Sequence, residues 1–232
     1  MSSFSTDLKS IRAETFAAKT ERNCDYPNMH AVQAFCEGYE TNYIQSFQKT
    51  ELMQFQNPVP RSTWLSLCLS TLHQARVNKR NVFLIGNGAS CSMASHFATD
   101  LTKNGKMSAH SINEGALLTC FANDYSFESM YENIVRCKMA DNDVLVAISS
   151  SGCSVNIVRA AQYVRDQHPN ATVLTFTGFS KDNALIRTGH LNLWVPYGDY
   201  GIVESVHAYF LQLLVDAFTM CNQNFSTMAH LS

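Results

Sequence analysis

The strongest constraint on this chain is a regular alternation of short apolar runs with helical stretches, which begins after Arg80. Five apolar runs, the second weaker than the rest, predict strands at 81–85, 108–112, 143–148, 172–177 and 191–195. The stretches between and after them predict helices at about 90–104, 127–139, 154–167 and 201–220. Near-continuous Val, Ile, Leu and Phe strands that alternate with helices are typical of a covered parallel sheet. The pattern predicts an α/β fold: a doubly wound parallel five-stranded sheet with helices on both faces.

Two helices are predicted ahead of this alternating region. From Met29 to Phe55, apolar and aromatic residues recur every three or four positions, which is the stripe of an amphipathic helix. Pro58 and Pro60 end the pattern, because proline lacks the N–H of the helical hydrogen bond and disfavours helix at the preceding residue. Ser62 can then cap a second helix that runs to about Asn78.

A single domain is predicted over residues 29–222, with these two helices as its N-terminal extension. The chain has 232 residues, enough to bury a large core, and no internal repeat or low-complexity linker divides it. Residues 1–28 are polar and weakly patterned and predict a flexible arm. Residues 223–232 are predicted to form a C-terminal tail.

Charge and hydropathy exclude several classes of protein. Seventeen Lys and Arg against nineteen Asp and Glu give a formal net charge of −2, so no broad basic surface exists to bind nucleic acid directly. No apolar run approaches the ~18 residues of a membrane helix, and the N-terminus lacks the apolar stretch of a secretory signal. The eight cysteines are scattered, which is typical of reduced, mostly buried thiols. We expect a cytoplasmic protein without membrane contact.

Small polar residues follow two predicted strands, at the edge where open α/β sheets bind ligands. GNGAS at 86–90 follows the first strand, and SSSGCS at 149–154 follows the third. Glycines let the backbone approach an anion, hydroxyl groups donate hydrogen bonds to it, and the following helix N-terminus favours negative charge. A polar turn with a serine cap is the simpler interpretation of either loop alone. The two loops together favour a site for a phosphate monoester.

A nucleotide cofactor is not expected at these loops. Cys91 occupies the position of the third glycine in the dinucleotide-binding fingerprint, and the strand at 107–112 has no clear terminal acid for a ribose. The Gly-Lys-Ser/Thr of a P-loop is also missing. A dehydrogenase is therefore disfavoured.

Four motifs in this order resemble the sugar isomerase (SIS) domain family: GNGAS at 86–90, AND at 122–124, ISSSGCS at 148–154 and TFTG at 175–178. The chain is most similar to the bacterial phosphoheptose isomerases, over roughly residues 29–220. The resemblance implies the SIS fold and the conversion of sedoheptulose 7-phosphate to D-glycero-D-manno-heptose 7-phosphate. The alternative is a non-catalytic SIS protein that binds a phosphosugar or a protein partner, because a relative that binds the replication initiator shares these loops.

The resemblance also implies which residues hold the sugar phosphate. They lie in the two polar loops and in the asparagine-aspartate pair between them: Asn87, Gly88, Ser90, Asn123, Asp124, Ser149, Ser150, Ser151 and Ser154.

The residues for proton transfer depart from the family pattern. Isomerisation through an enediol needs a base that moves a proton between neighbouring carbons and an acid that protonates the adjacent oxygen. Asp100 stands where the family has its base glutamate, and Gln212 stands where it has its catalytic histidine. Glutamine cannot exchange a proton at neutral pH. The catalytic candidates are therefore Asp100 as base and Glu204 or His207 as acid.

A candidate zinc site and an oligomer follow from the resemblance as well. Some family members bind zinc with the equivalents of His96, Asp100, Glu204 and Gln212, of which this chain keeps one imidazole and two carboxylates. Taken alone, His96 is more simply a core histidine and Asp100 a solvated acid. The family's N-terminal helices build a tetramer, so we expect a homotetramer in which His207 could face a neighbour's Asp100.

Overall fold

The computed structural model describes the backbone of residues 28–229 and the side chains of residues 28–221. The chain divides into two compact units, Met1–Thr41 and Asn42–Ser232. In the first unit, the described residues after Asn28 belong to helix α2 (Met29–Gln48), which ends in the second unit. The predicted arm at 1–28 falls almost entirely outside the described residues.

The second unit is built on a seven-stranded sheet in the order β2-β1-β7-β6-β5-β3-β4. All five predicted strands are present and pair in parallel: β3 (Asn81–Gly86), β4 (Ser108–Ser111), β5 (Val144–Ser149), β6 (Thr172–Thr177) and β7 (Leu191–Trp194). The number five is wrong for the whole sheet, because β1 (Glu51–Gln54) and β2 (Asn57–Pro58) extend it in antiparallel pairing.

Strand β1 lies where the first predicted helix was expected to continue. That helix ends at Gln48, and Leu52 and Met53 are buried in a strand that pairs with β7. The backbone of this segment therefore bonds to a strand about 140 residues further along the chain, a tertiary pairing that overrides the local apolar spacing.

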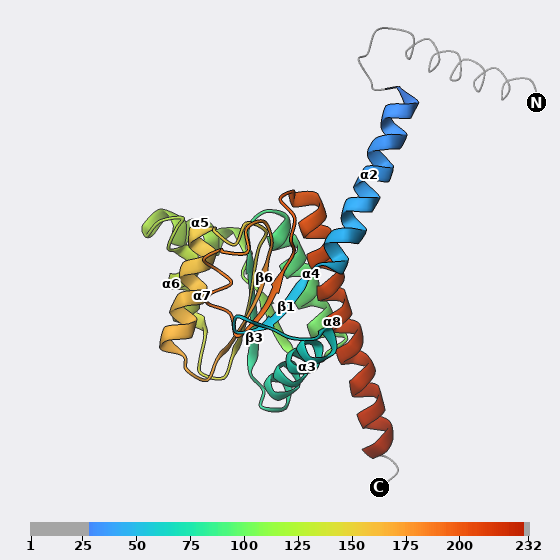
Figure 1. Ribbon diagram of the computed structural model, residues 1–232. Helices are drawn as coiled ribbons and strands as arrows, with labels where there is room; N and C mark the ends of the chain where they lie inside the picture. Colours follow the sequence, from blue (N-terminus) through green and yellow to red (C-terminus); the bar gives the residue numbers. More distant parts are fainter. Residues whose placement is uncertain (1–27, 230–232) are drawn as a thin grey trace, which may run out of the picture. The chain divides into compact units, whose positions relative to one another are not determined.

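Helices cover both faces of the sheet, as predicted (Figure 1). Helices α3 (Arg61–Val77), α4 (Ala89–Lys103) and α8 (Tyr200–Ala229) pack on one face, and α6 (Met130–Lys138) and α7 (Val155–Gln167) on the other. Helix α5 (Gly115–Asp124), which the sequence pattern did not predict, packs beside α6. The cap of α3 is Pro60 rather than Ser62, and α8 continues past its expected end near residue 220.

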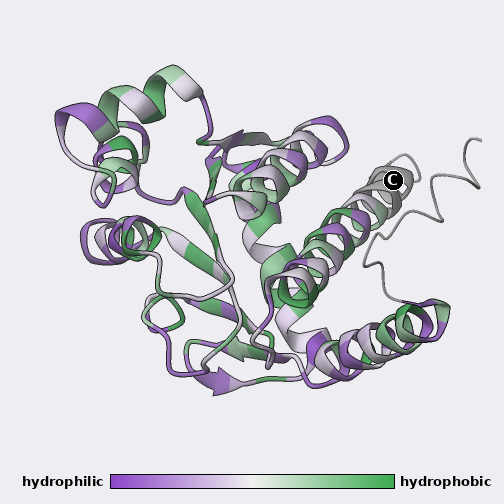
Figure 2. Ribbon diagram, turned by 90° about the horizontal axis from the view of Figure 1, so that it is seen from above, coloured by the Kyte–Doolittle hydropathy of each residue, from purple (hydrophilic) through white to green (hydrophobic). Residues whose placement is uncertain are grey.

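The strands are apolar at nearly every position because two cores need them. Val82 and Leu84 join the core under α3, α4 and α8, whereas Phe83 and Ile85 join the core under α6 and α7. Figure 2 shows the apolar residues of the strands enclosed between the helices. Strand β5, in the middle, is buried along its whole length. Within the described part of the chain, no helix combines the length and the apolar character needed to cross a membrane.

The strand order places the two polar loops side by side. From β3 the chain adds β4 on one side and then β5, β6 and β7 on the other, so the order of the strands reverses between β3 and β5. Open sheets of this type bind ligands at that point, outside the carboxyl ends of the strands. Gly86 pairs with Ile148 in the β3–β5 register, so the loops that follow start at the same edge.

Candidate functional site

The first loop turns sharply into the N-terminus of α4. Gly88 has φ 55° and ψ −125°, a backbone conformation that glycine alone adopts without strain. Helix α4 then begins at Ala89, and Ser90 is buried in its first turn. The positive end of the α4 dipole therefore lies at this loop, where it favours an anion.

A buried tyrosine holds the start of this loop. The Tyr131 hydroxyl donates a hydrogen bond to the Gly86 carbonyl oxygen at 2.8 Å. The Cys91 side chain is in turn hydrogen-bonded to the Tyr131 side chain. Burial raises the pKa of both the Tyr131 hydroxyl and the Cys91 thiol. The Cys91 thiol is therefore not activated as a nucleophile. The seven described cysteines are free thiols, but only Cys68 is buried, so the expectation of mostly buried cysteines is wrong.

The second loop gathers four serines, two of which are buried. Ser149 Oγ donates to Ser154 Oγ at 3.2 Å, and Ser151 Oγ accepts the N–H of Cys153 at 3.2 Å. The Ser150 side chain is 4% exposed, and its hydroxyl has no hydrogen-bond partner among the described residues. A buried hydroxyl left without a partner costs about 1–3 kcal/mol, and a ligand oxygen that bonded to it would remove that cost.

Gly152 gives this loop its shape. Its φ of +65° is left-handed, and a Cβ atom at this position would lie 2.1 Å from the Asn183 Oδ1 atom. Asn183 is itself fixed, because it accepts the N–H of Ile186 and donates to the Ser180 carbonyl. Only glycine fits both the conformation and the space.

Two asparagines join the loops to each other. Asn87 Nδ2 donates to Asn156 Oδ1, and Asn156 Nδ2 donates to Asn87 Oδ1, both at 3.0 Å. Asn156, in the first turn of α7, was not among the predicted site residues, and its position after Ser154 gave no signal of this contact. The resemblance placed the Asn87 side chain on the sugar, whereas the structure pairs it with Asn156.

His207 lies in the core, where no solvent reaches it. Its Nε2 atom is 3.0 Å from the Thr177 carbonyl oxygen, and Thr177 pairs with Ser149 in the β5–β6 register. Burial lowers the pKa of His207 to about 4, so the ring is neutral at pH 7 and donates this bond. The expectation that His207 faces a neighbouring subunit's Asp100 does not fit this position.

The two carboxylates proposed for proton transfer lie on α4 and α8. Asp100 Oδ2 is 3.4 Å from His96 Nε2, one turn away, as the spacing predicted. The His96 side chain is 72% exposed and so is not a core histidine. Glu204 is partly buried, and burial raises the pKa of its carboxyl group. A raised pKa lets a carboxyl group hold a proton closer to neutral pH, as a general acid requires.

The candidate zinc ligands do not form a metal site within this chain. His96 and Gln212 line one cavity of about 260 Å³ between α4 and α8, and Gln212 Nε2 donates to Asp216 Oδ1 at 3.0 Å. Among the residues that the structure describes, no three His, Cys, Asp or Glu side chains come together closely enough to hold a metal ion. Within one chain, His96, Asp100 and Glu204 are therefore not gathered around a metal position.

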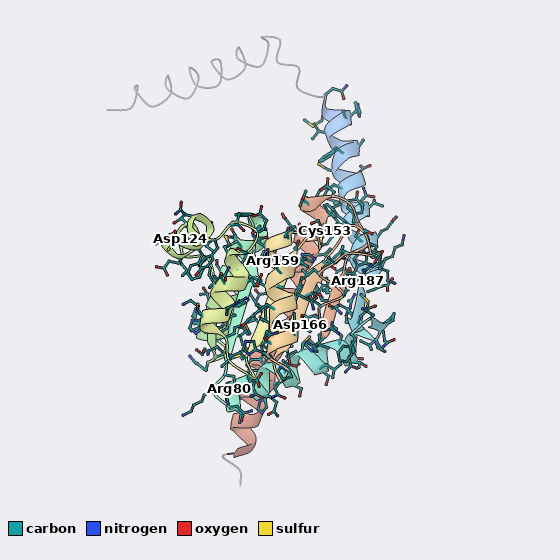
Figure 3. All side chains as sticks on the ribbon, turned by 90° about the vertical axis from the view of Figure 1, so that its left-hand side faces the viewer. Arg80, Asp124, Cys153, Arg159, Asp166 and Arg187 are labelled. Carbon is teal, nitrogen blue, oxygen red and sulfur yellow. The ribbon has the colours of Figure 1, made fainter. Side chains whose placement is uncertain are left out.

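Asn123 and Asp124 lie apart from the serine loop. Both side chains are exposed at the C-terminal end of α5, where Asn123 Nδ2 donates to Asp124 Oδ1 at 2.9 Å. Figure 3 shows Asp124 well separated from Cys153 of the second loop. The structure therefore brings together the residues of the two loops and leaves this pair on another element.

Comparison with known proteins agrees with the motifs and the fold. Residues 67–178 match the SIS domain model. A phosphoheptose isomerase of Bordetella avium is 32% identical over 158 residues, which cover 66% of this chain and 80% of that protein. The structure of phosphoheptose isomerase GmhA from Neisseria gonorrhoeae superposes with a TM-score of 0.68 at 21% identity, over 83% of this chain and 98% of that one. The Vibrio vulnificus NanR protein, complexed with ManNAc-6P, superposes with a TM-score of 0.60 at 16% identity, over 85% of this chain and 67% of that one.

Proposed function

Because the chain belongs to the SIS domain family, we propose that it binds a sugar phosphate at the loops after β3 and β5 and interconverts its aldose and ketose forms. The observation that carries this proposal is the meeting of two small polar loops, the second rich in hydroxyls, and two helix N-termini at one edge of the sheet. The curated relatives are named phosphoheptose isomerases, which supports sedoheptulose 7-phosphate as the substrate and D-glycero-D-manno-heptose 7-phosphate as the product.

The phosphate group is proposed to bind the second loop. Its oxygens accept hydrogen bonds from the hydroxyls of Ser150, Ser151 and Ser154, while Ser149 supports the site by donating to Ser154 Oγ. Ser90 and the backbone at Gly88 approach from the first loop. The N-termini of α4 and α7 add favourable dipoles for a dianion. Local donors of this kind suit a chain whose net charge is only −2.

The isomerisation itself is proposed to use Asp100 and Glu204. The Asp100 carboxylate removes the proton from the carbon next to the carbonyl, the C–H electron pair forms the enediol double bond, and Glu204 protonates the carbonyl oxygen. The proton on Asp100 exchanges with solvent while the enediol is bound, and a proton then passes from Asp100 to the neighbouring carbon. At the same time Glu204 takes back the proton of the other enediol hydroxyl, whose oxygen becomes the aldehyde carbonyl. Asp100 is ten residues beyond Ser90 on α4, about 15 Å along the helix axis. We therefore propose that a neighbouring subunit supplies Asp100 to each site.

Proton exchange gives the most direct test. Sedoheptulose 7-phosphate incubated with the protein in D₂O should yield the aldose and gain deuterium at the carbon next to the carbonyl, followed by NMR, with and without added Zn²⁺. Asp100→Asn should lose both signals and keep its affinity for the sugar phosphate. Absence of turnover and of deuterium exchange in the wild-type protein would exclude isomerisation of this substrate.

Gln212 favours a second candidate function, a phosphosugar-binding protein without catalysis. Its amide stands at the position of the family's catalytic histidine and is bonded to Asp216. Such a protein would be stabilised by a sugar phosphate, by about 2.7 kcal/mol at a ligand concentration of 100 Kd, without turning it over. Stabilisation without exchange would select this function, and no stabilisation by any sugar phosphate would leave a role in binding a protein partner such as a replication initiator.

A further inference from the structure

The Asn87–Asn156 pair joins the two loops of the proposed site, and its geometry is reciprocal. We propose that Asn87 and Asn156 are positioning residues for ligand binding. Their paired side chains hold the two loops at the separation that the ligand needs, and both asparagines are required for it. The inference rests on the proposed function and deepens it, because it makes the two loops a single site whose spacing is set by two side chains.

The side-chain amides of the two asparagines make the same pair of hydrogen bonds. Each gives one N–H and its carbonyl oxygen to the other, over two bonds of 3.0 Å. Asn156 Oδ1 also accepts the backbone N–H of Ile157 at 3.0 Å. An asparagine amide has two N–H donors and an oxygen with two lone pairs, so half of the donor capacity and half of the acceptor capacity of Asn87 are already committed.

Burial makes this pairing hard to give up. Asn156 is 1% exposed, so its amide has no access to water that could replace Asn87. Buried polar groups of folded proteins are almost always bonded, and loss of one partner leaves the other unsatisfied. The two bonds therefore persist or break together.

The pair fixes the distance between the donors on the two loops. Asn87 lies between Gly86, whose carbonyl is held by Tyr131, and the N-terminus of α4. Asn156 lies in the first turn of α7, two residues after Ser154. A phosphate that bonds to both loops needs them at one separation, and misplacement by about 1 Å can cost about a hundredfold in function. Asn87 thus matters to the ligand through the position of both loops.

A double-mutant cycle tests the proposal with sugar phosphate binding as the readout. Asn87→Ala and Asn156→Ala should each weaken sedoheptulose 7-phosphate binding by about tenfold, and the double variant by about the same tenfold, because either change breaks both bonds. Independent roles would instead give about a hundredfold for the double variant, and that result would overturn the proposal. An unchanged Kd in Asn156→Ala would overturn it as well.

The Asn87 side-chain amide of the wild-type protein provides a second readout that does not depend on how the variants fold. Its ¹H–¹⁵N signals should exchange slowly with solvent and should stay in place at saturating sugar phosphate. A large ligand-induced shift confined to Asn87 would instead indicate a direct contact with the sugar.

Thr175→Val serves as the matched control, because it removes a buried side-chain bond to Asn192 within the sheet. It should lower stability and leave Kd unchanged. If the wild-type protein bound no sugar phosphate, the proposed function itself would be rejected. If the wild-type protein bound it and the losses of affinity in the two single variants added up in the double variant, only the role of this pair would be rejected.

Discussion

The Ser150 hydroxyl is buried and has no hydrogen-bond partner among the residues that the structure describes, whereas Ser149, Ser151 and Ser154 bond to each other or to the backbone. Ser150→Ala should therefore separate binding from stability. Removing an unsatisfied hydroxyl should leave the free energy of unfolding equal or higher by up to about 1 kcal/mol, while sugar phosphate binding should weaken by about tenfold. Calorimetric titration and urea denaturation measure the two effects.

Thr219→Val is the control for this variant, because the Thr219 hydroxyl is likewise buried without a partner among the described residues, but on α8 at a distance along the chain from both loops. It should leave the Kd unchanged. A loss of stability in Ser150→Ala with no change in Kd would contradict a ligand contact at Ser150.

The neutral imidazole of His207 should make stability depend on pH. The folded pKa of about 4 lies below the ordinary value of 6.5, so between these two values the unfolded chain binds more protons than the folded one. Stability is therefore complete above about pH 6.5 and falls as the pH drops toward 4, by about 3 kcal/mol for this group. Urea denaturation of His207→Gln should show a shallower fall between pH 7.5 and pH 5 than the wild-type protein.

An equal slope in the wild-type protein and in His207→Gln would contradict a depressed pKa at His207.

The loop between β5 and α7 depends on a glycine that no other residue can replace. Gly152→Ala should lower the free energy of unfolding by about 1–3 kcal/mol, because the left-handed backbone is strained and the new methyl group meets Asn183. It should also abolish sugar phosphate binding by shifting the serines. Gly198→Ala, whose added methyl group meets nothing within 4 Å and whose φ is not left-handed, should change neither quantity appreciably. Equal effects of the two substitutions would argue against this account.

The parallel strands and the two loops could be predicted from the sequence because their signals are local. A strand covered on both faces is apolar at each position, and a loop at its end shows as a run of Gly and Ser. Strand β1 could not be predicted, because Leu52 and Met53 fit helical spacing equally well and the pairing with β7 is not visible locally.

Other residues of the site could not be predicted because their contacts are with residues far away along the chain. Tyr131 and Asn156 act through partners 45 and 69 residues away, which no local pattern indicates. The burial of His207 did leave a signal, because Val203, Val206 and Phe210 surround it at helical spacing and mark that face of α8 as a core face.

Helix α2 exposes apolar side chains that a soluble monomer would usually bury, among them Met29 at 80% and Phe35 at 70% exposure. We expect a homotetramer by light scattering at micromolar concentration. Phe35→Ser should shift the protein toward smaller species and lower turnover at the same time, because Asp100 is proposed to act across subunits. Phe127→Ser, which removes another exposed aromatic ring outside α2, should change neither.

A wild-type monomer, or a dissociated Phe35→Ser variant with full turnover, would contradict the shared site. Full binding of sugar phosphate by the dissociated variant would be expected, since the two loops belong to one chain.

The β1–β2 hairpin, which lies where the sequence predicted that a helix continues, has a consequence for aggregation. The sheet ends on one side in β2, two residues that include Pro58, and on the other in β4, four residues of the sequence SAHS. Neither margin offers the long, flat, apolar template on which strands of another molecule would stack into aggregates. We therefore expect any self-association of this protein to use its helices and not the margins of its sheet.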